Sequence, residues 1–136
     1  MNYTEFEEKV KSMTAHDIII AMVEGLRNPR TKINMMTFGR MENGICYGCA
    51  ATNAVLQIMN ANEEEVMEHI IGRHNILAFK VYLSSETYQF ELAIDGLKNG
   101  KVDLYNKYAI NVGFAQIKPI PGVKKLPCLW NDYTED

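Results

Sequence analysis

Two cysteines separated by two residues, Cys46 and Cys49, have the spacing in this chain that most directly suggests chemistry. They lie in the segment NGICYGCAATNA, residues 43–54, which runs from a glycine-framed motif into alanines. The thiolate is the reactive form of cysteine, and the backbone amides at a helix N-terminus lower the pKa of a thiol placed there. If Gly48 is the N-cap of the following helix, Cys49 lies in its first turn and has the position of a nucleophile toward an acyl carbon.

The same segment resembles the active-site segment of papain-like cysteine proteases at Cys46, Cys49 and Ala51. It departs from that family at the two residues between the cysteines and at Ala50, where the family has an aromatic residue. The resemblance implies that Cys49 is the nucleophile. The histidine of that family lies about 130–150 residues downstream, whereas 87 residues follow Cys49 here. We therefore do not expect a papain domain.

Three chemical interpretations of the cysteine pair stay open. A small hydrolase would pair Cys49 with His69 or His74 as the base. A zinc site would need Cys128 and a histidine to complete the half-site that Cys46 and Cys49 form. A thioredoxin-type redox pair would need a strand before the motif, where the sequence predicts an irregular loop.

The structural interpretation is that small side chains let the helix after the cysteines approach a neighbour closely. We expect this interpretation to hold, with Cys49 buried, no cofactor and no bound metal.

The segment 29–44 is too long for an ordinary helix connection, and it has no helical periodicity. Long irregular segments of compact domains tend to be functional or disordered, and the apolar residues here favour a packed loop, with a possible short hairpin about Asn43-Gly44. Asn53, on the next helix, either holds this loop by its backbone, which we favour, or lines a ligand pocket. The candidate binding residues are Met35, Phe38, Arg40, Tyr47 and Asn53.

Most of the remaining sequence has the caps and apolar spacing of helices. Thr14, with Asp17 three residues on, predicts a capped helix that Asn28-Pro29 ends. The segment 76–83 fits a strand or a helix, and we lean to helix. The prolines after Phe114 predict an extended tail held by Trp130. Further helices are expected over 4–13, 50–59, from Asn62 to about Gly72, and in a helical hairpin over 85–112.

With 136 residues and 47% apolar content, the chain is expected to form a single domain over residues 1–136, with the extended tail from about 114. The predicted fold class is mainly α, a compact bundle of five or six helices with one long packed loop before the Cys46/Cys49 helix. More than about half of the residues should be helical.

The net charge of −3 gives no basic footprint for nucleic acid. The charged N-terminus does not fit a signal peptide, and no apolar run approaches the roughly 18 residues of a membrane span. We therefore expect a small cytoplasmic, non-enzymatic binding protein. Its partner would be another protein or a small ligand, contacting the Met-rich loop and the N-terminus of the Cys46/Cys49 helix. The alternative is a small thiol-dependent enzyme with Cys49 as nucleophile and His74 as base.

Overall fold

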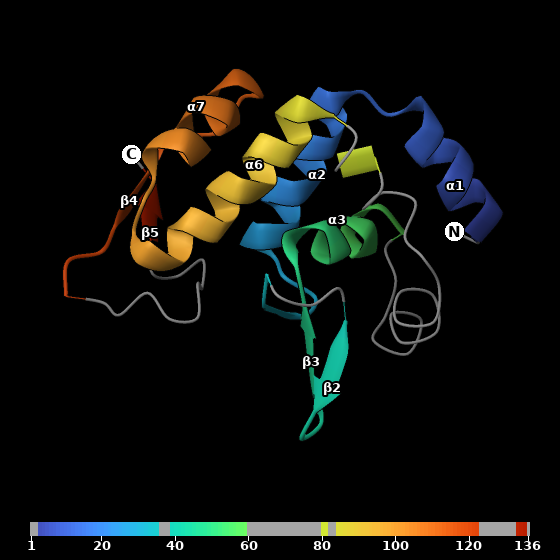
Figure 1. The fold of residues 1–136 in the computed structure, drawn as a ribbon, viewed down its shortest axis with the longest axis horizontal. Coiled ribbons are helices and arrows are strands. Elements are labelled where there is room, and N and C mark those ends of the chain that lie inside the picture. The colour runs from blue at the N-terminus through green and yellow to red at the C-terminus, as the bar shows by residue number, and fades with distance from the viewer. Residues whose placement is uncertain (1–2, 36–38, 60–79, 82–83, 123–132, 136) are drawn as a thin grey trace.

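The computed structural model describes residues 3–35, 39–59, 80–81, 84–122 and 133–135. Within these ranges lie five α-helices, a short 3-10 helix and two small sheets (Figure 1). The helices are α1 (Tyr3–Ser12), α2 (Ala15–Arg27), α3 (Ala50–Met59), α6 (Ser85–Gly96), η2 (Leu97–Asn99) and α7 (Asp103–Asn111).

About 60% of the structure is helical, which agrees with a mostly helical chain. The prediction of a pure bundle of five or six helices is nevertheless wrong, because the described residues also form a sheet of three strands and a sheet of two. The fold is mixed α/β. The predicted helix from Asn62, most of the segment 76–83 and Trp130 lie outside the described residues.

Helix α2 begins at a capping box formed by Thr14 and Asp17. The Thr14 Oγ1 atom accepts a hydrogen bond from the Asp17 amide at 3.1 Å, and the Asp17 carboxylate accepts one from the Thr14 amide at 2.9 Å. This reciprocal pair is the predicted capping box, and it satisfies two amides that the first turn leaves without helical partners. The apolar side of α2, including Met22 and Val23, is fully buried in the centre of the protein (Figure 1).

Helices α2 and α3 pack closely because a glycine lies between them. A Cβ atom added to Gly25 of α2 would be 2.8 Å from the carbonyl carbon of Asn53 and 3.0 Å from the amide nitrogen of Ala54, both in α3. Every residue of α3 from Ala50 to Leu56 is buried. Helix α3 is therefore enclosed on nearly all sides, which a chain of small residues permits.

The long connection before α3 contains a three-stranded sheet. Its strands are β1 (Lys32–Ile33), β2 (Arg40–Glu42) and β3 (Ile45–Gly48), in the order β1-β3-β2. The hairpin of β2 and β3 turns at Asn43 and Gly44, whose φ angles of 52° and 77° fit a two-residue type I′ turn. The predicted hairpin is present, and it projects away from the helices (Figure 1). The parallel pairing of β1 with β3 was not predicted.

The C-terminal half begins with the predicted helical hairpin. The rings of Phe90 in α6 and Tyr105 in α7 stack with centroids 5.5 Å apart. The tail then forms a second sheet, in which β4 (Ile117–Pro119) pairs antiparallel with β5 (Tyr133–Glu135). Ile117 and Tyr133 are buried, so the tail is part of the core rather than only an extended surface segment.

We predict that Gly25→Ala lowers the free energy of unfolding by about 1–3 kcal/mol, because the added methyl group meets the backbone of α3 and cannot move it cheaply. Gly96→Ala is the matched control, since its Cβ would lie 3.6 Å from the nearest atom. That control should be neutral or stabilising by about 0.5–1 kcal/mol. Urea denaturation of both variants measures the difference, and equal effects would contradict the close packing of α2 on α3.

Candidate functional site

Three of the predicted site residues, Tyr47, Cys49 and Asn53, lie in or next to the junction of β3 and α3. Asn53 is fully buried. Its Oδ1 atom accepts hydrogen bonds from the backbone amides of Arg30 at 2.9 Å and Thr31 at 3.0 Å. Its Nδ2 atom donates to Thr31 Oγ1 at 2.7 Å and to the Cys49 carbonyl oxygen at 3.1 Å.

These contacts use both lone pairs and both protons of the carboxamide, so Asn53 has no hydrogen-bonding capacity left for a ligand. Of the two roles predicted for it, the geometry supports the one in which it holds the loop by its backbone. The residues just before β1 are thereby fixed to the first turn of α3.

Cys49 directly precedes α3 and is 2% exposed. Its carbonyl oxygen accepts the hydrogen bond of the Asn53 amide at 3.1 Å, as an N-cap carbonyl does. Burial raises the pKa of the Cys49 thiol, and the hydroxyl of Thr52, 3.5 Å from Sγ, only partly offsets this, while the Glu91 carboxylate adds to the rise. Burial therefore outweighs the helix N-terminus, and the thiolate that a nucleophile needs is disfavoured.

Within the described part of the chain, His16 is the one histidine that could act as a base for Cys49. Its Nε2 atom lies 3.3 Å from a carboxylate oxygen of Glu86, and its side chain is 60% exposed, at the start of α2. His69 and His74, the predicted bases, lie outside the described residues.

The other two interpretations of the cysteine pair depend on Cys46. It lies in β3 and is half-buried, and both Cys46 and Cys49 are thiols rather than a disulfide. The expectation of an irregular loop before Cys49 is wrong, because this segment is a strand. The unit is still not βαβ, since the chain from β1 to β3 passes through the antiparallel β2. The described residues contain no cluster of three metal-ligating side chains, and Cys128 lies outside them.

The hairpin presents two different faces. Its register pairs Arg40 with Tyr47, Met41 with Cys46, and Glu42 with Ile45. Because side chains alternate along a strand, the first and third pairs share one face and the second pair lies on the other. We call residues 40–47 the hairpin surface.

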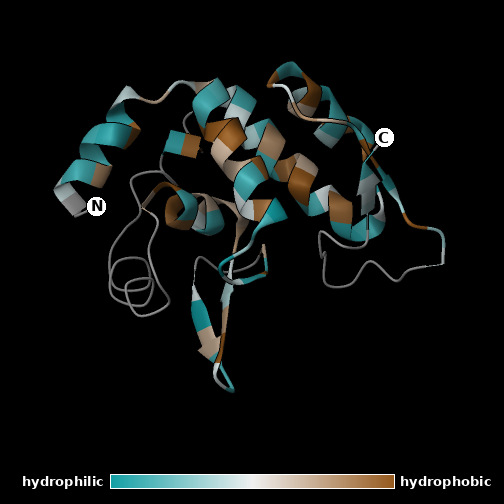
Figure 2. Ribbon diagram, turned by 180° about the vertical axis from the view of Figure 1, so that it is seen from behind, coloured by the Kyte–Doolittle hydropathy of each residue, from teal (hydrophilic) through white to brown (hydrophobic). Residues whose placement is uncertain are grey.

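On the first face of the hairpin surface, three side chains interact. The Arg40 guanidinium is 3.1 Å from the Glu42 carboxylate and lies over the Tyr47 ring, 5.4 Å from its centroid. On the second face, Met41 is 45% exposed. Figure 2 shows that this projecting element carries both hydrophilic and hydrophobic residues.

The structure thus brings Arg40 and Tyr47 together, whereas Asn53 is buried in the core. Met35 is half-buried and packs against the core. Phe38 lies outside the described residues.

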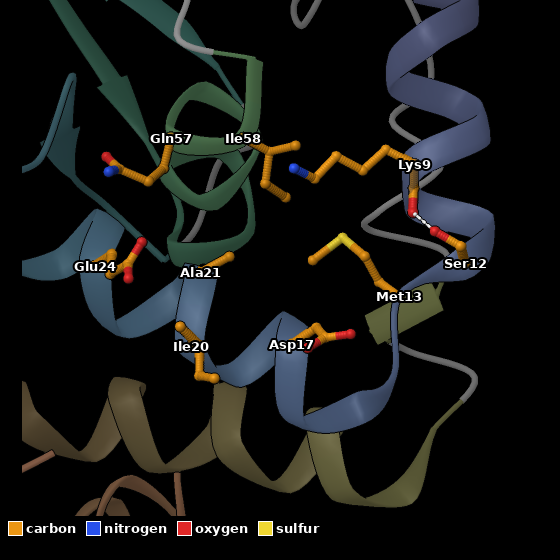
Figure 3. Close-up of a pocket in the computed structure, with 9 residues that line it drawn as sticks. All are labelled: Lys9, Ser12, Met13, Asp17, Ile20, Ala21, Glu24, Gln57 and Ile58. Atoms are coloured by element: carbon orange, nitrogen blue, oxygen red, sulfur yellow. Dashed lines mark hydrogen bonds between the residues drawn. The ribbon is translucent and has the colours of Figure 1, made fainter. Parts of the chain in front are cut away.

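Sequence reasoning missed one further feature, a groove of about 440 Å³ between α1, α2 and α3 (Figure 3). Its polar lining residues, such as Lys9, Glu24 and Gln57, come from three different helices. Each looks like an ordinary exposed position in its own helix, so no local pattern could have found them.

None of the helices in the described part of the chain combines the length and apolar character needed to cross a membrane. Comparison with known protein families, with curated protein sequences and with solved structures returns no match to this chain. The case for function therefore rests on the geometry alone.

The raised pKa of Cys49 predicts a pH dependence of stability. The folded state keeps the thiol protonated, whereas unfolding exposes a thiol whose ordinary pKa is 9.0. The stability that this group contributes is complete below that pKa and is lost as the pH rises above it. Between about pH 8 and about pH 10, the free energy of unfolding should fall more steeply in the wild type than in Cys49→Ala, by up to about 1.4 kcal/mol per pH unit.

Urea denaturation across this range measures the difference between the two proteins, and all other titrating groups cancel in the comparison. Parallel pH profiles for the two proteins would show that folding does not raise the pKa of the Cys49 thiol. That result would return the thiol to consideration as a nucleophile.

Proposed function

We propose that the protein is a small, non-enzymatic binding module that presents the hairpin surface to a partner protein. The observation that carries the proposal is that the hairpin side chains are exposed while the base of the hairpin is fixed to the helical core. Arg40, Met41 and Glu42 are all exposed, while Asn53 ties the segment before β1 to the start of α3, the junction from which the hairpin projects.

The side chains on the hairpin surface suit protein recognition. Tyr, Arg and Met are enriched at protein interfaces relative to the rest of the surface, and Tyr and Arg are frequent among the residues that carry most of the binding energy. The Arg40–Tyr47 contact holds both side chains in one arrangement before a partner arrives. A surface that is ordered in advance loses less conformational entropy on binding.

The burial of Cys49 supports a binding role over the thiol-dependent enzyme. An acyl substrate needs access to the sulfur, and a side chain 2% exposed offers little. We place this binding function in the cytoplasm, where reduced thiols are the rule, and we do not expect nucleic acid as a partner because the chain is acidic overall.

The partner can be found with a photo-crosslinking amino acid at position 41 of the protein expressed in its native cells. The same residue at position 110 is the control, because Ile110 on α7 is 51% exposed and outside the hairpin. We expect a discrete protein adduct from position 41 that position 110 does not give. Identical adduct patterns, or none from position 41, would contradict the proposal.

Binding of the purified partner then tests which contacts matter. Arg40→Ala should weaken it by about tenfold, as removal of an interface anchor does. Lys107→Ala is the matched control, because Lys107 also lies over a tyrosine ring, that of Tyr108, at 5.8 Å, but on α7. A loss as large in Lys107→Ala as in Arg40→Ala would indicate a general charge effect and not recognition by the hairpin.

A further inference from the structure

The groove between α1, α2 and α3 has polar residues on two sides, with apolar residues between them (Figure 3). Glu24 and Gln57 lie on one side, and Lys9 and Ser12 on the other. Its volume of about 440 Å³ is within the range of small-molecule sites. The apolar lining between the two sides consists of Met13, Ile20, Ala21 and Ile58.

The polar side chains of the groove are available for a ligand. Within the described chain, the Glu24 carboxylate, the Lys9 ammonium and the Gln57 carboxamide have no hydrogen-bond or ion-pair partner. Glu24 and Gln57 are also half-buried. A half-buried carboxylate beside apolar groups gains more from a bound cation than a fully hydrated one does, because less water competes for it.

Asp17, which also lines the groove, has a different role. Its carboxylate accepts the hydrogen bond of the Thr14 amide at 2.9 Å, and this bond is the main cause that lowers its pKa. Asp17 is therefore committed to capping α2. The anionic group with no such commitment is Glu24, seven residues further along the same helix.

The wall of the groove that α1 forms is held in place by Lys80. The Lys80 ammonium donates hydrogen bonds to the carbonyl oxygens of Val10 at 2.6 Å, Lys11 at 3.2 Å and Met13 at 2.6 Å. A cation at these carbonyls satisfies the orphan acceptors at the C-terminus of α1 and complements its dipole. Lys9 of α1 and Met13, which directly follows α1, thus line the groove from an anchored segment.

We propose that this groove binds a small zwitterion with an apolar body, in the class of ω-amino acids and short peptides. Its ammonium group contacts the Glu24 carboxylate and the Gln57 carboxamide oxygen. Its carboxylate contacts the Lys9 ammonium. The apolar body covers Met13 and Ile58. The site lies apart from the hairpin surface, so it stands independently of the proposed protein partner.

The proposal can be tested with 6-aminohexanoate as the probe, in a titration followed by the amide chemical shifts of the whole protein. Hexylamine and hexanoate, which each lack one of the two charges, are the matched ligands. We expect 6-aminohexanoate to bind most tightly and hexanoate, which Glu24 repels, most weakly. The largest shifts should fall in α1, α2 and the end of α3. Equal affinities for the three probes, no saturable binding below about 10 mM, or shifts confined to other elements would overturn the proposal.

Variants separate the two charged contacts. Glu24→Gln keeps the size of the side chain and should weaken 6-aminohexanoate binding by about tenfold, because it removes a half-buried charged contact. Lys9→Gln should weaken it by about threefold, since an exposed ion pair contributes less. Glu8→Gln removes the same charge from an exposed position of α1 outside the groove and should leave binding unchanged. A loss as large in Glu8→Gln as in Glu24→Gln would show a nonspecific charge effect.

Discussion

One buried carboxamide, that of Asn53, connects the two kinds of structure in this protein. After the turn that follows α2, the backbone amide of Thr31 is buried and that of Arg30 is partly buried. Asn53 Oδ1 satisfies both, at 2.9 and 3.0 Å. Leaving a buried amide without a partner costs about 1–3 kcal/mol, which is a large share of the few kcal/mol that separate folded from unfolded chains. The position of β1, and through it the whole small sheet, depends on this contact.

The close contact of α2 with α3 involves the same turn of α3 that contains Asn53. Gly25 approaches backbone atoms of Asn53 and Ala54 in α3. The Asn53 side chain in this same turn of α3 bonds to the loop. A small residue in α2 and a run of alanines in α3 let the helix axes come near enough for the core to close around Asn53. The glycine between the cysteines has a related use, because a Cβ at Gly48 would lie 2.8 Å from Thr31 Oγ1. The motif C-Y-G-C is therefore accounted for as an entry from a strand into a buried helix.

The parts of the fold that could be predicted are those set by neighbouring residues. The capping box of Thr14 and Asp17, the bounds of α3 and the turn at Asn43-Gly44 all depend on contacts within a few positions. The sheets could not be predicted in this way, because their pairings are not local. Strand β1 pairs with β3, which follows β2 in the chain, and β4 pairs with β5, more than ten residues later. Such short strands carry almost no alternation pattern of their own, and tertiary contacts decide their conformation.

The candidate site also has parts that local sequence could predict and parts that it could not. Arg40 and Tyr47 were predicted as candidate binding residues of the long loop, but the strand register that places them opposite each other was not predicted. Asn53 was singled out because a buried polar residue that follows alanines needs partners. The pKa of the Cys49 thiol is raised by burial, and the Glu91 carboxylate of α6 adds to the rise. The groove depends on three helices. Both arise from packing between distant segments, which local spacing does not encode.

Native-state hydrogen exchange of the Arg30 and Thr31 amides tests the central claim most directly. If Asn53 fixes the loop to α3, these two amides are exposed only when the helices separate. Their free energy of exchange should then match that of the most protected amides of α2 and α3. Exchange of the Arg30 and Thr31 amides at the rate of an exposed loop, while α3 stays protected, would contradict the account, because it would mean that the loop and its hairpin open independently of the helical core.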